Sequence, residues 1–231
     1  FHFNIIAPLI NTFLFVLIFS TINKFYILDI NEDSYINFLI PGVVIMIVIQ
    51  TSFNHLSEVI ISMKQTGSFN DYLCSPISRI EIFISFMLSS IVVCTFVGVL
   101  NLLILSIFTD FVNLNYFKIF YYILATVITF SSLGALIGFV SFTWDFTSAI
   151  SNFFVIPVSF LSGTFFPISS LDSEWEKIFT YNPIFHIVEG FRGAFIQKEI
   201  NIHNDVFIIL TVFIFFVSSL LIFKKGYKVI F

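Results

Sequence analysis

Long apolar stretches dominate this sequence and constrain its fold more than any single motif. The hydrocarbon core of a membrane is about 30 Å thick, and an α-helix needs roughly 20 apolar residues to cross it. Charged residues make up 10% of the 231 residues, whereas a soluble domain carries about 25%. The sequence therefore predicts an all-α membrane protein in one transmembrane domain, 1–231, with six transmembrane helices at about 3–22, 36–53, 80–108, 117–142, 148–166 and 206–223.

The charges between the apolar stretches indicate which side of the membrane each connection faces. The closing sequence FKKGYKVIF carries three lysines, whereas the connection after the first stretch, NKFYILDINEDSY, carries three acidic residues and one lysine. Basic connections stay in the cytoplasm. We therefore predict a cytoplasmic C-terminus and, with six spans, a cytoplasmic N-terminus. The connection 62–79 then faces the cytoplasm, and the segment 164–196 faces outward.

Several classes of function are disfavoured by what the sequence lacks. A net charge of -4 does not supply the basic surface that nucleic-acid binding requires. The sequence has no GxxxxGK[ST] phosphate loop, no HExxH motif and no cluster of Cys with His, so we predict no catalytic, cofactor-binding or metal-binding residues. The predicted span interiors hold no carboxylate, His or Lys, which disfavours an ion-coupled transporter. A membrane scaffold without transport stays open as an alternative.

The connection 62–79 combines charge with helical periodicity. Phe69, Tyr72 and Leu73 stand at i, i+3 and i+4, which predicts a short helix, Ser68–Cys74, with a small apolar face. Two interpretations remain open for this helix. It is either part of a solvated connector, or its exposed aromatic residues dock onto a soluble partner.

Capping signals mark the starts of two further helices. Pro76 ends the short helix, and Ser78 with Glu81 matches a capping box that begins the third span. In the short connection after the fourth span, Asp145 and Thr147 precede the fifth span, and Thr147 is the expected cap.

The outward segment begins where the fifth span ends. Gly163 and Pro167 interrupt the apolar run and end that helix early. Ser173 followed by Glu176 matches a capping box, which predicts a short helix that carries Trp175, a residue type favoured at the membrane interface.

A second short helix is predicted after Asn182 and Pro183, which break the first. It covers about 184–196, and Glu189 and Arg192 stand on it at i, i+3, where they can form an ion pair. We expect both short helices to re-enter the outer leaflet and pack on the spans, because irregular backbone at membrane depth must be buried in protein. An interfacial cap with a structural role alone is the alternative.

The sequence GALIG in the fourth span places Gly134 and Gly138 at GxxxG spacing. This spacing allows two helices to approach closely. Packing inside one subunit is favoured here over packing between two copies.

Two stretches carry motifs of a known family in order and in spacing. They are YINFLIPGVVIMIVIQTSFNHLSEVI, followed closely by GSFNDYLCSPIS, and FLSGTFFPISSLDSEWEKIFTYNPIFHIVEGFR. Both resemble permease subunits of ABC-type-two exporters, closest to the multidrug and polysaccharide export branch, and the likeness extends over essentially the whole chain. It departs from the family at Asn70 and Asp71, at Asp172 and Ser173, and at His186, where tyrosine is common.

The resemblance implies that the connection 62–79 is a coupling helix that docks on a separate ATPase subunit. That subunit would bind ATP and Mg. The implied docking residues are Gly67, Phe69, Asp71, Tyr72, Leu73, Pro76 and Arg79, with Asp145 as a second contact. The implied re-entrant outer gate comprises Gly163, Pro167, Trp175, Asn182, Pro183, Glu189, Gly190 and Arg192.

The resemblance also implies what the protein does. We expect a transmembrane subunit that pairs with a second copy of itself as a homodimer, works with ABC ATPase subunits in a bacterial-type inner membrane, and exports an amphipathic, drug-like or lipid-like substrate. Export of a polysaccharide or lipid-linked glycan is the alternative. Because the sequence starts at Phe1 without Met, the N-terminal interface helix of the family is expected to precede it.

Overall fold

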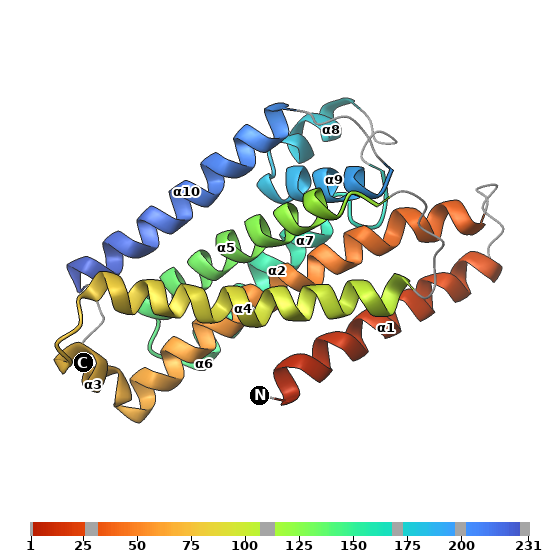
Figure 1. Cartoon of the computed structure of the whole chain (residues 1–231). Helices are drawn as coiled ribbons and strands as arrows, with labels where there is room; N and C mark the ends of the chain where they lie inside the picture. The colour runs from red at the N-terminus through yellow and green to blue at the C-terminus, as the bar shows by residue number, and fades with distance from the viewer. Residues whose placement is uncertain (1, 26–31, 107–113, 168–172, 197–201, 227–231) are drawn as a thin grey trace.

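The computed structural model describes residues 2–25, 32–106, 114–167, 173–196 and 202–226, and the regular structure in these ranges is helical (Figure 1). The predicted all-α class is therefore confirmed. In chain order the elements are α1 His2–Phe25, α2 Glu32–Thr66, α3 Ser68–Cys74, α4 Arg79–Leu105, α5 Tyr116–Val140, α6 Trp144–Ile150, the π-helical turn η2 Ser151–Val155, α7 Ile156–Phe160, α8 Ser173–Thr180, α9 Pro183–Ile196 and α10 Ile202–Lys225.

Four of these helices are long and apolar enough to cross a membrane. Within the described residues, the stretches that meet this criterion are Asn37–Thr66, Arg79–Leu105, Tyr116–Val140 and Asn204–Lys225. In α1, which runs from His2 to Phe25, the part that could be assessed by this criterion is Ile6–Ile18. The predicted fifth span consists of α6, η2 and α7 instead of one regular helix. A multi-pass membrane protein follows from the four helices, and the count of six spans stays a prediction.

Helix α2 extends well beyond its predicted end at residue 53. It continues to Thr66, so His55, Glu58 and Lys64 lie on the same helix as the apolar residues before them. The predicted span 36–53 itself holds no ionisable group, but the helix that contains it carries three beyond residue 53. The polar residues resembled a loop in the sequence, but the α2 backbone continues because neighbouring helices cover much of this part of it.

The close contact between α2 and α5 lies at the centre of the bundle. Gly134 of α5 faces the backbone of Phe53 on α2 so closely that a Cβ atom there would overlap the Phe53 carbonyl oxygen. One turn further along α5, a Cβ atom at Gly138 would lie 3.2 Å from both Ile60 and Ser57 of α2. Both glycines of the GxxxG sequence thus face a helix of the same subunit.

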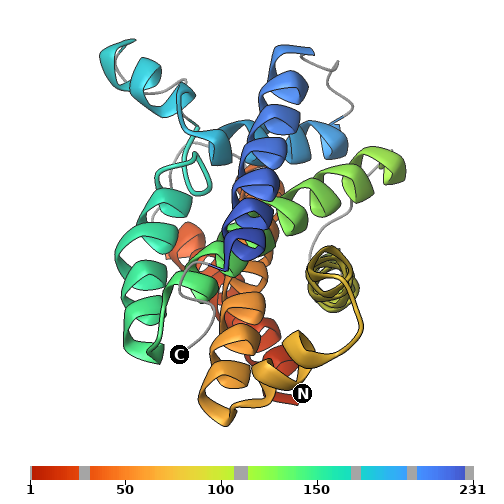
Figure 2. The same ribbon diagram turned by 90° about the vertical axis from the view of Figure 1, so that its left-hand side faces the viewer.

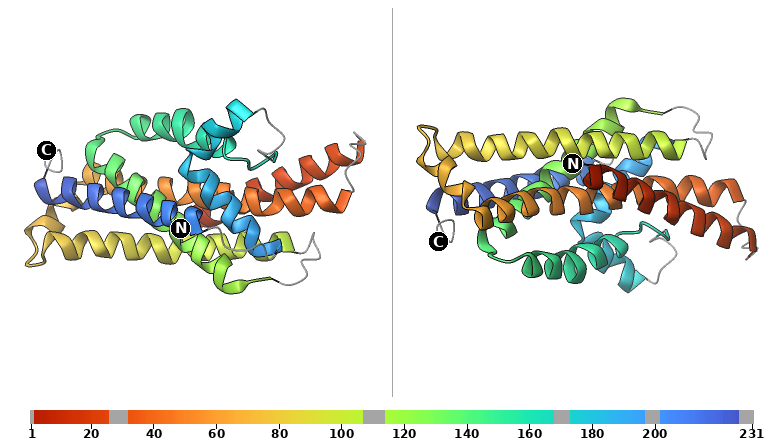
Figure 3. Two further views of the ribbon diagram at one scale, coloured as in Figure 1. Left: turned by 90° about the horizontal axis from the view of Figure 1, so that it is seen from above. Right: turned by 90° about the horizontal axis from the view of Figure 1, so that it is seen from below.

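The other elements attach to this pair of helices. Helices α1, α4 and α9 pack on α2, while α10 packs on α5. The segment α6–η2–α7 packs mainly on α2 and lies on the opposite side of the bundle from α4, as the two rotated views agree (Figures 2 and 3). Its Phe153 and Phe154 are 84% and 57% exposed. This segment therefore leaves an apolar side that no other described helix covers.

The N-terminal cap of α4 was predicted correctly, whereas that of α6 was not. Ser78 accepts a hydrogen bond from the Glu81 amide, and the Glu81 carboxylate accepts one from the Ser78 amide, so the predicted capping box is confirmed. At α6 the cap is Thr143, whose hydroxyl oxygen accepts a hydrogen bond from the Phe146 amide. Thr147 lies inside α6 and donates to a carbonyl of the preceding turn.

The close contact at Gly134 predicts a graded response to added methyl groups. Gly134→Ala should lower the free energy of unfolding by about 1–3 kcal/mol, because the new methyl group meets rigid backbone and the two helices must separate. Gly138→Ala should have a smaller effect, because its nearest contacts are at 3.2 Å and alanine gains about 1 kcal/mol of helix propensity. Thermal unfolding of both variants in mild detergent measures this order. Equal unfolding temperatures for the two variants would contradict it.

Candidate functional site

Helix α3 is held at the end of the bundle that also contains the last turn of α10 (Figure 1). Gly67 precedes α3 with a φ of 76°, in the left-handed region, which lets the chain turn sharply after α2. The Arg79 side chain donates a hydrogen bond of 2.7 Å to the carbonyl oxygen of Lys224 on α10. The predicted helix Ser68–Cys74 is confirmed, and it lies beside the basic C-terminal end of α10.

Phe69 of α3 points into the bundle. Its side chain is 2% exposed, and its ring centroid lies between 6.2 and 6.4 Å from the rings of Phe86 on α4, Phe139 on α5 and Phe223 on α10. The expectation that Phe69 contacts a docked partner is therefore wrong in this structure. The physical reason is that three helix ends supply an aromatic pocket that covers Phe69 inside the subunit.

Lys64, near the end of α2, makes a second connection that was absent from the sequence predictions. Its side chain is 4% exposed. Its ammonium group donates to the carbonyl oxygens of Gly138 and Ser141, each at 3.0 Å, and also to that of Phe139. These carbonyls end α5, where free carbonyls and the helix dipole favour a cation. A single lysine with apolar neighbours, in IISMKQT, was the available sequence signal.

The remaining residues of the predicted docking set form an exposed surface at this end. Asp71, Pro76 and Arg79 are exposed, Tyr72 is 43% exposed, and Leu73 is half-buried. Asp145 is exposed in the first turn of α6. The preceding residue, Trp144, donates a hydrogen bond to Gln65 of α2, so α6 and α3 are both attached to the last turns of α2. We call Asp71, Tyr72, Pro76 and Asp145 the inner-end surface.

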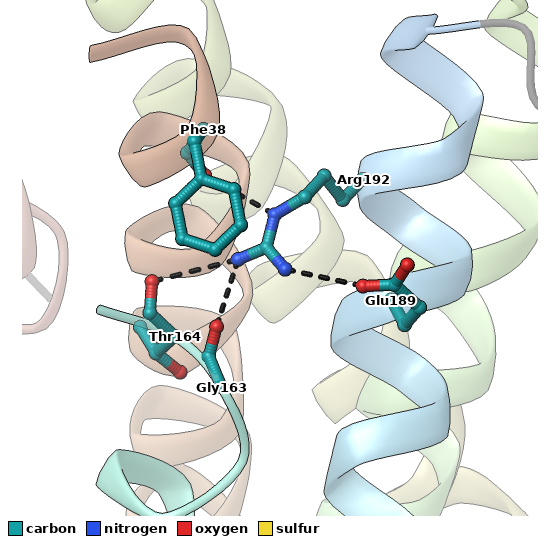
Figure 4. A network of polar contacts seen from close by, with 5 residues as sticks. All are labelled: Phe38, Gly163, Thr164, Glu189 and Arg192. Atoms are coloured by element: carbon teal, nitrogen blue, oxygen red, sulfur yellow. Dashed lines mark hydrogen bonds and ion pairs between the residues drawn. The ribbon is translucent and has the colours of Figure 1, made fainter. Parts of the chain in front are cut away.

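Arg192 of α9 organises a polar cluster at the other end of the bundle (Figure 4). Its guanidinium group donates to the carbonyl oxygen of Phe38 on α2 at 3.2 Å and to that of Gly163 at 2.9 Å. It also pairs with Glu189 at 3.2 Å, which confirms the predicted i, i+3 pair. The guanidinium carbon lies 3.7 Å from the centre of the Phe38 ring. Arg192 thereby joins α9, α2 and the turn after α7.

The arginine is buried, with 5% of its surface exposed. Burial lowers the pKa of Arg192, whereas the charge and the hydrogen bond of Glu189 raise it. An arginine stays protonated under such opposing effects because its ordinary pKa lies far above neutral pH. The cluster therefore presents a permanent positive charge, which the backbone carbonyls and Glu189 satisfy.

Two glycines allow this turn to approach α2. Gly163 has a φ of 74°, which favours glycine. A Cβ atom at Gly42 of α2 would lie 2.6 Å from the Thr164 carbonyl oxygen and 3.2 Å from the Arg192 guanidinium. Close packing therefore explains the glycine of the Pro41–Gly42 pair, which carried part of the family resemblance.

The other predicted gate residues are spread around this cluster. Asn182 accepts a hydrogen bond from the Ile184 amide and donates to the Val158 carbonyl, so it caps α9 and ties it to α7. Pro183 is the first residue of α9. Gly190 packs directly against the ring of Tyr122 on α5. Pro167 is exposed, and Trp175 on α8 is 57% exposed, so these two lie outside the packed cluster.

Some of the predicted features lie outside the described residues. These are the acidic connection after α1, the last lysine of the chain, and the side chains of Ser173 and Glu176, so their capping box stays a prediction. Within the ranges that the structure does describe, no group of three or more His, Cys, Asp and Glu residues is placed to hold a metal ion.

The Arg192 cluster predicts a specific loss when the guanidinium is replaced. Arg192→Lys keeps the charge but cannot span the Phe38 and Gly163 carbonyls together, because an ammonium is a point donor. Losing a charged hydrogen bond costs about 1.5–3 kcal/mol, so amide hydrogen exchange over residues 161–166 should become at least about tenfold faster.

Glu189→Gln is the matched control for this experiment. It keeps an oxygen acceptor for Arg192 and leaves both carbonyl contacts in place, so the exchange rates over 161–166 should change less than in Arg192→Lys. Unchanged exchange in Arg192→Lys would show that the cluster does not hold the turn.

Comparison with known proteins supports the interpretation of this architecture. The family model described as "ABC-2 type transporter" matches residues 2–196. The protein named inner membrane transport permease YadH from Escherichia coli K12 is 26% identical over 207 residues, which cover 90% of this chain and 79% of that protein. The protein of the same name from Shigella flexneri gives the same values. With the family model matching well over half of its length, the chain belongs to the ABC-2 type transporter family.

Proposed function

We propose that this protein is the membrane subunit of an ATP-driven exporter and that the inner-end surface docks on an ABC ATPase subunit. The ATP and Mg sites belong to that partner. Nucleotide-driven movement of the ATPase is passed to the bundle through α3, and the substrate leaves at the end of the bundle where α8 and α9 lie. The relative YadH is named an inner membrane permease, and we assign the same membrane to this chain.

The attachment of α3 to the bundle is the observation that carries this proposal. Phe69 inserts between the ends of α4, α5 and α10, and Lys64 binds the end of α5. A force applied to α3 is therefore passed to α4, α5 and α10 through packed side chains, because close-packed interiors transmit strain. A solvated connector, the alternative for this loop, would not need these contacts.

The contacts of Arg192 suit a closure at the opposite end. They hold the turn at Gly163 and the second half of α9 against α2, where irregular backbone needs protein partners. We assign these contacts to a closed outer gate, which opens when α9 or α2 moves relative to the other.

A second copy of this chain completes the transporter in our proposal. The segment α6–η2–α7 packs mainly on α2 and exposes Phe153 and Phe154, which leaves an apolar side available to another helix. A π-helical turn such as η2 often marks a functional position. Homodimerisation with this segment at the interface would form a path between two symmetric halves.

An amphipathic, drug-like or lipid-like cargo fits the bundle better than a glycan. The buried core is mostly Ile, Val, Leu and Phe, with Ser and Thr as its main polar members. These hydroxyls largely donate to carbonyls of their own helices, as Thr126 and Thr129 do. They therefore leave few groups free to bind sugar hydroxyls.

The docking proposal is tested at Tyr72, which is exposed where Phe69 is not. Co-purified with its ATPase in lipid, the Tyr72→Ala protein should lose most of the stimulation of ATP hydrolysis by substrate, because an aromatic anchor in an interface contributes about 2 kcal/mol or more. The variant should unfold at the wild-type temperature, because the side chain is 43% exposed.

Trp175→Ala is the matched control, since Trp175 is an exposed aromatic residue at the opposite end. It should leave ATPase association and stimulation unchanged. Wild-type coupling in Tyr72→Ala, or an equal loss in Trp175→Ala, would contradict docking at the inner-end surface.

A further inference from the structure

A cavity of about 220 Å³ lies between α1, α2 and α4. By volume it has room for about seven water molecules, and it is smaller than the usual site for a whole drug-sized ligand. It lies away from the inner-end surface and from the Arg192 cluster, and none of the predicted site residues line it. The cavity is therefore a separate feature that the proposed docking and gating do not use.

The cavity has an apolar part and a polar part. Ile47 of α2 and Val93 and Val97 of α4 line the apolar part, whereas Asn54, His55 and Glu58 of α2 line the polar part. A rise of 1.5 Å per residue separates Ile47 from Glu58 by about 16 Å along the helix. A ligand that fits both parts must itself be amphipathic.

The polar side chains of the cavity have no partners among the described residues. The Nδ1 atom of His55 is buried and makes no hydrogen bond there. The side chains of Gln50, Asn54 and Glu58 likewise make no hydrogen bond or ion pair within the described ranges. The buried His55 nitrogen is the costly member of this set, because an unpaired polar group is expensive in a membrane-spanning helix, whereas Gln50 and Asn54 are half-buried and Glu58 is exposed. A buried nitrogen without a partner, beside accessible polar groups, indicates that something else binds in the cavity.

The position of the cavity along α2 places its polar part near a membrane boundary. The described part of this span, Asn37–Thr66, has 30 residues, and its charged residues Glu58 and Lys64 lie toward its second end. A hydrocarbon core of about 30 Å covers about 20 residues of helix, so this charged end extends to the membrane boundary. A charged head group beside Glu58 would thus lie at the interface, with its apolar part directed toward Ile47.

We propose that this cavity binds the ammonium head group of an amphipathic amine. Among the described residues that line it, Glu58 alone is charged, so the site attracts a cation and repels an anion. The Glu58 carboxylate, the amide oxygens of Gln50 and Asn54, and the unpaired His55 nitrogen can each accept an N–H hydrogen bond. Hydrogen bonds from a charged donor to such acceptors are the stronger kind.

Binding of the amine stands apart from ATP-driven export. If the amine is the exported cargo, this cavity is a recognition site that the cargo reaches before the outer gate opens. That assignment rests on the proposed function. The test therefore measures binding directly, without ATP and without a partner.

The experiment is calorimetric titration of the full-length protein in lipid nanodiscs, with empty nanodiscs subtracted. The probes are hexylammonium, hexyltrimethylammonium and hexanol, which share one chain. Hexylammonium should bind at least about tenfold more tightly than hexanol. Hexyltrimethylammonium should lie between them, because it keeps the charge but has no N–H donor.

Two variants locate the site. Glu58→Gln should weaken hexylammonium binding by about tenfold and leave hexanol binding unchanged, whereas Glu174→Gln, which alters an exposed carboxylate on α8, should change neither. Val93→Phe fills the apolar part of the cavity and should abolish saturable binding of hexylammonium and hexanol. Unfolding temperatures confirm that each variant is folded. Glu58→Gln keeps the size and shape of an exposed side chain.

Three results would overturn the proposal: equal binding of hexylammonium and hexanol, an equal loss in Glu58→Gln and Glu174→Gln, or binding that survives Val93→Phe. Absent amine binding while Tyr72→Ala still uncouples the ATPase would reject the amine site and retain the exporter. Amine binding by a protein that never couples to an ATPase would retain the site and reject its role in cargo recognition.

Discussion

The backbone contact between α2 and α5 is the constraint on which the rest of the bundle depends. At Gly134 the two helices are so close that only a hydrogen atom fits between them. In a membrane, where lipid is as apolar as the side chains, such close packing replaces the hydrophobic effect as the source of helix association. The other spanning helices α4 and α10, and the shorter helix α9, then pack on one or both members of this pair.

Both ends of α2 are fixed by a buried cation that binds backbone carbonyls. Lys64 binds the carbonyls that end α5, and Arg192 binds those of Phe38 and Gly163. The carbonyls at the end of α5 and the Gly163 carbonyl in the turn after α7 lie where the chain leaves regular helix, so they lack an intrahelical partner. The side chains of Lys64, at the α3 end, and Arg192, at the α9 end, thus supply the hydrogen-bond donors that a continuing helix would supply to these carbonyl groups.

Local patterns predicted the elements of this protein better than they predicted their contacts. The helix Ser68–Cys74, the Ser78–Glu81 capping box and the Glu189–Arg192 pair depend on residues within a few positions, and the sequence displays all of them. The burial of Phe69 depends on Phe139 and Phe223, which lie far along the chain. The true end of α2 was hidden for the same reason, since the carbonyls that bind Lys64 come from α5.

The length of α2 has a mechanical consequence. A helix of 35 residues is about 50 Å long, and contacts at Gly134 and Gly138 keep its middle against α5. A tilt of about 10° about the contact at Phe53 would move Phe38, which lies about 22 Å further along the helix, by about 4 Å, and this exceeds the reach of the hydrogen bonds around Arg192. In the proposed mechanism α2 would therefore act as a lever arm that pivots at the glycine contacts, and a small angle on one side of the pivot would open or close a contact on the other.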